Sequence, residues 1–232
     1  MWCLFVKAIR ILVYHKVMEK IFKVILEFLL PQKTLTREIL AMSAEDFRKA
    51  VPSCEKFASP DSFALFDYKN PFVRQAIWEL KYRGNKKIAR LLAECLYEEL
   101  AEELAERKTF DNFDKPLLLP IPLSKKRQRK RGFNQCELLT DALAAIDLGN
   151  FFETPKDILV KIKDTESQTA KRRAERLANL SGCFAISDPE AISGRNVIIV
   201  DDVTTTGATL EEARKTLAKA GAKKVLAVTI AH

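Results

Sequence analysis

The stretch that decides the fold is VIIVDDVTTTGATL, residues 197–210. It begins with four apolar β-formers, continues with two adjacent carboxylates and changes at once to Thr-Thr-Thr-Gly. An apolar β-branched run favours a buried strand, whereas clustered hydroxyls and a glycine favour neither a strand nor a helix. Two adjacent acids at the end of an apolar strand repel each other. We therefore expect a group from outside the chain to balance them.

This stretch predicts a strand, a loop and a helix that together bind phosphate. The strand over 196–200 is followed by a loop over 203–208 and by a helix that Thr209 and Glu212 begin as a capping box. Unpaired N–H groups at a helix start, together with the helix dipole, attract a phosphate. The loop threonines add hydroxyl donors, and Gly207 lets the backbone close around the anion.

The two acids suggest the rest of the ligand. Asp201 and Asp202 lie beside the expected phosphate, so acceptors there suit hydroxyl groups such as a ribose 2′,3′-diol, with Mg²⁺ relieving the charge. The sequence contains neither the nucleotide-hydrolase P-loop pattern nor the dinucleotide glycine pattern. The expected ligand is a sugar phosphate with a free diol. The alternative is a strand–turn–helix whose acids merely cap the helix.

Short apolar strands alternate with amphipathic helices along the rest of the chain. Alternation of this kind predicts an α/β fold with a mostly parallel central sheet and helices on both faces. The expected strands are 62–68, 116–122, 158–162, 182–187, 196–200 and 224–231, and the expected helices are 71–84, 86–106, one through 138–143, and 210–220.

The N-terminal part differs from this pattern. Residues 4–30 read as a basic amphipathic helix that ends at Pro31, and charged residues interrupt it too often for a membrane span. This helix packs on its own domain or contacts a membrane surface or a partner. We therefore expect an N-terminal helix and linker over residues 1–60 and an α/β domain over residues 61–232.

Composition limits the classes of function. The chain has 39 basic and 31 acidic residues, a net charge of +8, which suits an anionic partner or serves solubility alone. Its five cysteines lie more than 40 residues apart and it has two histidines. This spacing predicts no disulfide framework and no zinc site. We expect a cytoplasmic protein with reduced thiols.

A second constellation is PLLLPIPLSKKRQRKRGFNQCELL, residues 116–139. Six of the seven residues over 125–131 are basic, and we expect them to form a loop after a buried strand. That loop would lie on the same carboxyl-end rim as the phosphate loop. Cations there would stabilise a pyrophosphate leaving group, bind a nucleic-acid backbone, or form a solvated charge run. Phe133 would stack on a base or pack at the helix start.

Both constellations resemble known motifs. VIIVDDVTTTGAT resembles the 13-residue phosphoribosyl-pyrophosphate (PRPP) motif of type I phosphoribosyltransferases. The segment LPIPLSKKRQRKRGFNQCELL resembles the signature of the ComF family of competence-associated proteins, which have a phosphoribosyltransferase-like domain. Residues 76–96 and 164–186 are similar to that family too, so the resemblance covers about 70–232.

The resemblance implies a role for each matching residue. The acidic pair Asp201 and Asp202 would contact the ribose hydroxyls, with or without Mg²⁺, and would be catalytic together with Lys125, Lys126 and Arg127 of a pyrophosphate loop. The implied substrate-binding residues are Thr204, Thr205, Thr206, Gly207, Ala208 and Thr209 for the 5-phosphate, Ser124 in the pyrophosphate loop, Arg131, and Gln168, Arg172, Arg173 and Arg176 in a hood over the site.

The chain departs from the family at its N-terminus. ComF proteins usually carry a four-cysteine zinc ribbon there, whereas residues 29–54 contain Cys54 as their single cysteine. We therefore expect a degenerate zinc-ribbon region and no bound zinc.

Two classes of function follow from the resemblance. The first is an enzyme that binds Mg²⁺ and PRPP and transfers the phosphoribosyl group with release of pyrophosphate. The second is a non-catalytic accessory protein of DNA uptake and competence that binds single-stranded DNA or senses PRPP. The expected partners are PRPP or a related sugar phosphate, single-stranded DNA or DNA-uptake proteins, with no transmembrane segment, and a homodimer stays open.

Overall fold

The computed structural model describes residues 33–54, 61–163 and 181–232. The chain divides into two compact units, residues 1–38 and 39–232, and the sheet belongs to the second unit. The helix predicted over residues 4–30 lies outside the described residues. Within the described part of the chain, no helix combines the length and the apolar character that a membrane span requires.

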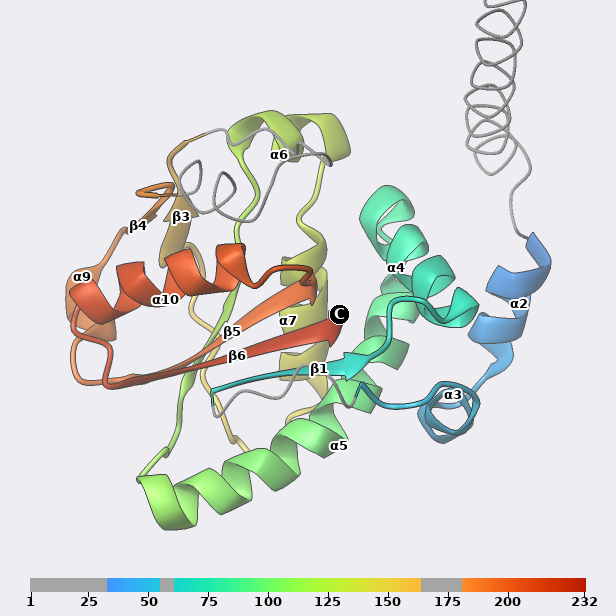
Figure 1. The fold of residues 1–232 in the computed structure, drawn as a ribbon, viewed down its shortest axis with the longest axis horizontal. Helices are drawn as coiled ribbons and strands as arrows, with labels where there is room; N and C mark the ends of the chain where they lie inside the picture. The colour runs from blue at the N-terminus through green and yellow to red at the C-terminus, as the bar shows by residue number, and fades with distance from the viewer. Residues whose placement is uncertain (1–32, 55–60, 164–180) are drawn as a thin grey trace, which may run out of the picture. The chain divides into compact units, whose positions relative to one another are not determined.

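The centre of the larger unit is a four-stranded sheet in the order β1-β6-β5-β2 (Figure 1). Its strands are β1 (Ser62–Phe66), β6 (Lys224–Ala231), β5 (Asn196–Val203) and β2 (Leu117–Pro120), and all three pairings are parallel. β5 is a central strand and is buried from its first residue to Asp202. Its continuous apolar run is what a strand covered on both faces requires, so the predicted α/β class is confirmed.

Helices cover both faces of this sheet. Figure 1 shows α10 (Ala208–Lys219) in front of the sheet and α7 (Gln135–Ile146) behind it. The buried side chains of α10 share one core cluster with alternate residues of the strands, including Leu117, Leu119, Val197, Ile199 and Ala227. Behind the sheet, α7 packs on β2 and β5, and α5 (Lys86–Asp111) packs on α7. α4 (Pro71–Arg83) packs in turn on α5.

Two of the predicted strands form a separate small sheet. β3 (Leu159–Lys161) and β4 (Phe184–Ile186) pair antiparallel with each other. At three residues each they are short, and α10 packs against β4. The remaining described helices are α2 (Lys33–Ala41), α3 (Ala44–Ala50), α6 (Lys125–Arg131) and α9 (Pro189–Ile192).

The basic segment is the helix α6, and the prediction of a loop was wrong. Ser124 is its N-cap and accepts a hydrogen bond from the Arg127 N–H at 3.4 Å. Gly132 ends it in the left-handed conformation with φ +81°. Lysine, arginine and glutamine are good helix formers, and a serine before them with a glycine after them are ordinary helix boundaries. The high density of charge over residues 125–131 had instead indicated a solvated loop.

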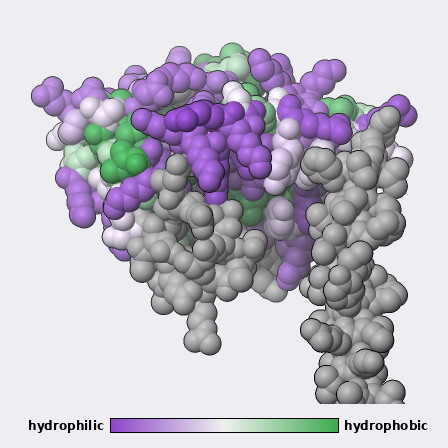
Figure 2. All heavy atoms as spheres, turned by 90° about the horizontal axis from the view of Figure 1, so that it is seen from above, coloured by the Kyte–Doolittle hydropathy of each residue, from purple (hydrophilic) through white to green (hydrophobic). Residues whose placement is uncertain are grey.

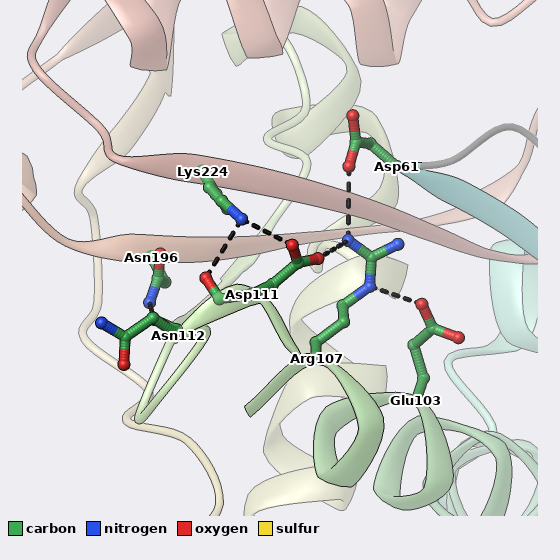
Figure 3. A network of polar contacts seen from close by, with 7 residues as sticks. All are labelled: Asp61, Glu103, Arg107, Asp111, Asn112, Asn196 and Lys224. Atoms are coloured by element: carbon green, nitrogen blue, oxygen red, sulfur yellow. Dashed lines mark hydrogen bonds and ion pairs between the residues drawn. The ribbon is translucent and has the colours of Figure 1, made fainter. Parts of the chain in front are cut away.

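A polar network lies at the amino ends of the strands (Figure 3). Lys224 at the start of β6 donates to the Asp111 carboxylate at 2.9 Å and to its carbonyl oxygen at 3.0 Å. Arg107 bridges Asp61 and Asp111 within the same network. The side-chain amide of Asn196, the first residue of β5, donates to the backbone carbonyl of Asn112 at 3.2 Å. The network ties the end of α5 to the sheet at the edge opposite the predicted site.

Substituting the two glycines that end α4 and α6 tests the packing of the Phe133 ring, which follows α6, on the end of α4. Gly84 and Gly132 both have positive φ, so alanine at either position costs about 1–2 kcal/mol of strain. A Cβ at Gly84 would also lie 3.0 Å from a ring carbon of Phe133, whereas a Cβ at Gly132 meets nothing within 4 Å. Urea unfolding should show that Gly84→Ala lowers the free energy of unfolding by about 1 kcal/mol more than Gly132→Ala does. Equal losses would contradict the contact.

Candidate functional site

The acidic pair lies inside the end of β5. The strand continues to Val203, because β6 keeps pairing with it through Asp201↔Thr229 and Val203↔Ala231. The prediction that the strand ends at residue 200 was therefore too short. Asp201 is 9% exposed and Asp202 is 3% exposed. Two neighbouring carboxylates are thus held largely out of water, which is costly unless other groups compensate them.

Lys81 of α4 supplies the compensating charge for Asp202. Its Nζ lies 3.0 Å from Asp202 Oδ2. Burial opposes the charged ammonium, but the Asp202 carboxylate outweighs this effect and the pKa of Lys81 is raised. Within the chain, Lys81 thus balances this carboxylate, and the expectation of a balancing group from outside the chain stays a prediction. The cation comes from a helix more than 100 positions earlier in the sequence.

The Cys136 thiol and the backbone hold the second acid. Cys136, in the first turn of α7, donates from Sγ to Asp201 Oδ1 at 3.4 Å, and the Asp202 N–H donates to the same oxygen at 2.9 Å. Burial, with the charges of both carboxylates, raises the pKa of the Cys136 thiol well above its ordinary value. The thiol therefore keeps its proton and remains a hydrogen-bond donor. Burial and the neighbouring Asp202 charge raise the pKa of Asp201 to about 7, although Lys81 partly offsets them.

The loop after β5 is shaped by its own threonines. Thr204 is buried, and its hydroxyl oxygen accepts the Gly207 N–H at 3.2 Å. The Thr204 N–H donates to the Ala231 carbonyl at 3.0 Å, and its own carbonyl lies 3.3 Å from His232 Nδ1. Thr204 therefore fixes the loop to the end of β6. Thr205 is exposed, whereas Thr206 and Thr209 are half-buried.

The helix after this loop starts at a glycine. The N-cap of α10 is Gly207, with φ +73° and no side-chain capping bond. The predicted capping box was wrong, because Thr209 already lies in the first turn and the Glu212 carboxylate accepts the Gly182 N–H. Gly207, in the left-handed conformation, therefore begins the helix two residues earlier than the capping signal of Thr209 indicated. A helix start without a side-chain cap leaves N–H groups for an anion.

The basic helix α6 lies at the same carboxyl edge of the sheet. β2, which leads into it, runs parallel to β5, and the Ile121 N–H donates to the Val200 carbonyl at 2.9 Å. Seen from above, the side on which α6 lies in Figure 1, the surface is largely hydrophilic (Figure 2). Lys125 and Lys126 are exposed and Arg127 is half-buried, so these cations remain available to an anion. Ser124 is buried and its hydroxyl caps the helix.

The C-terminal turn of α4 joins the two constellations. Lys81 contacts the acidic pair. The centroid of the ring of the next residue, Tyr82, lies 5.4 Å from the Arg131 guanidinium carbon. Gly84 faces the Phe133 ring, so this aromatic packs on α4. Sequence reasoning missed the roles of Lys81 and Cys136. Both lie in stretches that resemble the family, but neither has a spacing that relates it to the acidic pair.

The acidic pair does not fit a metal held by the protein alone. Ligand atoms of Cys136, Asp201 and Asp202 lie within 4.8 Å of one another. Magnesium, however, prefers six oxygen ligands and retains several waters, whereas this cluster is buried and contains a thiol. An ammonium also pairs with Asp202. We assign no resident metal to it.

Two further features complete the description of this region. A cavity of about 490 Å³ lies beside β2 and β3, lined by Lys125 and Arg129 from α6 among others, but by none of the acidic pair or the loop threonines. It is therefore distinct from the predicted phosphate site. The predicted hood residues Gln168, Arg172, Arg173 and Arg176 lie outside the described residues.

The titration of Asp201 should be visible in protein stability. Its pKa in the folded protein is about 7, against an ordinary value of 3.8, so between these values the folded protein holds a proton that the unfolded chain has released. The free energy of unfolding should therefore fall as pH rises through this window. Urea titrations of the Asp201→Asn variant should show a smaller fall than the native protein. The exposed Glu190→Gln variant controls for loss of a carboxyl, and identical profiles for Asp201→Asn and native protein would contradict the assignment.

Comparison with known proteins agrees with this geometry. A family model described as the phosphoribosyl transferase domain matches residues 138–232, which include β5, the loop and α10. Among solved structures, Trypanosoma cruzi hypoxanthine phosphoribosyl transferase aligns over 62% of this chain and 64% of that chain, at 14% identity and a TM-score of 0.38. That likeness is too weak to support any conclusion about function.

The curated relatives are more similar. The chain is 30% identical over 152 residues to competence protein ComFC of Bacillus subtilis, covering 66% of this chain and 56% of the relative. It is 34% identical to competence protein F of Haemophilus influenzae, covering 64% and 63%, so it spans less than two thirds of either relative. It is 33% identical over 165 residues to DNA utilization protein YhgH of Salmonella typhi, covering 70% and 67%. The chain therefore belongs to the ComF family of competence-associated proteins, with a phosphoribosyltransferase-like α/β domain.

Proposed function

We propose that this protein binds PRPP and transfers its phosphoribosyl group with release of pyrophosphate. The observation that carries the proposal is the buried acidic pair at the end of a central parallel strand, followed by the threonine loop and by a helix whose N-cap is Gly207. Ligands of open α/β sheets bind at this edge. The same segment lies within the matched phosphoribosyl transferase domain.

Each part of the site would take one part of the ligand. The 5-phosphate would bind at the start of α10, with N–H groups and the hydroxyls of Thr205, Thr206 and Thr209 as donors. The carboxylates of Asp201 and Asp202 would accept hydrogen bonds from the ribose 2′- and 3′-hydroxyls. Magnesium would arrive as part of the substrate, bound to the diphosphate.

The reaction is a substitution at C1 of the ribose. The bond from C1 to the pyrophosphate oxygen breaks and its electron pair leaves with pyrophosphate, while a lone pair of the acceptor forms the new bond to C1. Cations at the start of α6, namely Lys125, Lys126 and Arg127, would stabilise the charge that develops on pyrophosphate. Chemistry of this kind depends on positioning and electrostatics and requires no covalent nucleophile from the protein.

Calorimetric titration of Mg–PRPP tests the binding step. The Asp202→Asn variant should bind about tenfold to hundredfold more weakly, because it loses charge-assisted hydrogen bonds from a ribose hydroxyl. Glu190→Gln, which removes an exposed carboxylate of α9, should bind like the native protein. Absence of binding by the native chain, or equal binding by Asp202→Asn, would contradict the proposal.

A second candidate function is binding of single-stranded DNA, and a specific contact chain favours it. Arg83 lies over the Trp78 ring at 5.1 Å, Trp78 packs on Tyr82 at 5.6 Å, and Arg131 lies over Tyr82 at 5.4 Å. The Tyr82 side chain is 60% exposed. The sequence shows few aromatics among its basic residues, but the fold brings Tyr82, which packs on Trp78, beside Arg131 of the basic helix α6. Alternating aromatic and basic groups are the platform on which single-stranded bases stack.

Fluorescence anisotropy with labelled oligothymidine tests the second candidate. Tyr82→Ala should weaken binding by about 1–3 kcal/mol if a base stacks on this ring. Phe110→Ala removes another exposed ring, at the far end of α5, and should leave binding unchanged. Binding should also weaken steeply with salt, because α6 would neutralise backbone phosphates. Equal effects of the two substitutions would argue against the platform.

A further inference from the structure

Lys81 occupies an unusual place beside the acidic pair. Its side chain is 24% exposed, that of Asp202 is 4% exposed, and their charged atoms are 3.0 Å apart. Within residues 33–54, 61–163 and 181–232, Lys81 is the cation that forms an ion pair with either acid. It lies on α4, outside the strand–loop–helix segment that carries the proposed ligand contacts.

The ammonium lies against one oxygen of the cluster formed by Cys136, Asp201 and Asp202. Asp202 Oδ2 is buried and accepts no hydrogen bond of normal geometry, so its contact is the ion pair with Lys81. The other Asp202 oxygen accepts the Val203 N–H at 2.9 Å. Asp201 Oδ1 is taken up by the Cys136 thiol and the Asp202 N–H. Of these three oxygens, Asp202 Oδ2 is therefore the one whose partner is a side-chain cation.

We propose that Lys81 takes the place of a divalent cation at the acidic pair. It is thereby a specificity-determining residue, because it excludes free metal ions from the two carboxylates. The ammonium satisfies the charge of Asp202 in the free protein, so a hydrated Mg²⁺ would have to break a buried ion pair and shed water to enter. Free metal is thereby kept from the acids in the ligand-free protein. This inference concerns the ligand-free protein, so it does not depend on PRPP binding.

Titration of the ligand-free full chain with Mn²⁺ tests the proposal. Bound Mn²⁺ is detected through the relaxation of water protons, at about pH 8 where carboxyl groups are normally ionised. The variants are Lys81→Met, which removes the charge, Lys81→Arg, which keeps it, and Lys87→Met, which removes an exposed lysine near the start of α5. Thermal melting verifies that each variant is folded, and Lys81→Gln replaces Lys81→Met if the latter does not fold.

The proposal predicts a gain of metal affinity in one variant. Lys81→Met should bind Mn²⁺ about tenfold or more tightly than the native protein, because two carboxylates lose their neighbouring cation. Lys81→Arg and Lys87→Met should match the native protein, and adding Asp202→Asn to Lys81→Met should abolish the gain. A folded Lys81→Met variant without the gain would overturn the proposal, as would native protein whose Mn²⁺ affinity equals that of Lys81→Met and is lost in Asp202→Asn.

Discussion

The ion pair between Lys81 and Asp202 is the interaction on which the site depends. Two adjacent carboxylates at the end of a buried strand are costly in a medium of low polarity, and an unpaired buried charge commonly costs several kcal/mol. Three elements meet to compensate them: α4 through Lys81, α7 through the Cys136 thiol, and β5 through its own N–H groups. The placement of α7 on the sheet and of the end of α4 beside β5 is thus tied to the chemistry of the acids.

Two polar clusters lie at opposite ends of the sheet. The amino ends of β5 and β6 are held by the network around Lys224, Asp111 and Arg107 (Figure 3). The carboxyl ends carry the acidic pair, the threonine loop and the start of α6. Parallel strands place all their carboxyl ends at one edge, so a single architecture gathers residues from distant segments there. Changes at the functional edge can therefore leave the opposite network intact.

The turn of α4 from Lys81 to Gly84 connects the two proposed functions. Lys81 contacts the acid that would hold a sugar, Tyr82 contacts the arginine of the basic helix, and Gly84 contacts the ring that follows that helix. The proposed sugar-phosphate site and the proposed aromatic–basic platform therefore share the C-terminal turn of α4. The two proposed ligands, a sugar phosphate and single-stranded DNA, would bind at adjoining surfaces of this chain.

The sequence alone determined the parallel α/β class and the strand–loop–helix around residues 197–210, because apolar runs and helical periodicity are local signals. Local signals were misread where two competed: the charge of Lys125–Arg131 obscured a helix, and Thr209 suggested a cap that Gly207 provides. Only the tertiary structure decided that β5 extends through the acids, because its pairing with β6 sets that length. It alone also brought Lys81 and Cys136 to the acids, since contacts between residues so distant in sequence follow from helix packing and leave no pattern in either segment.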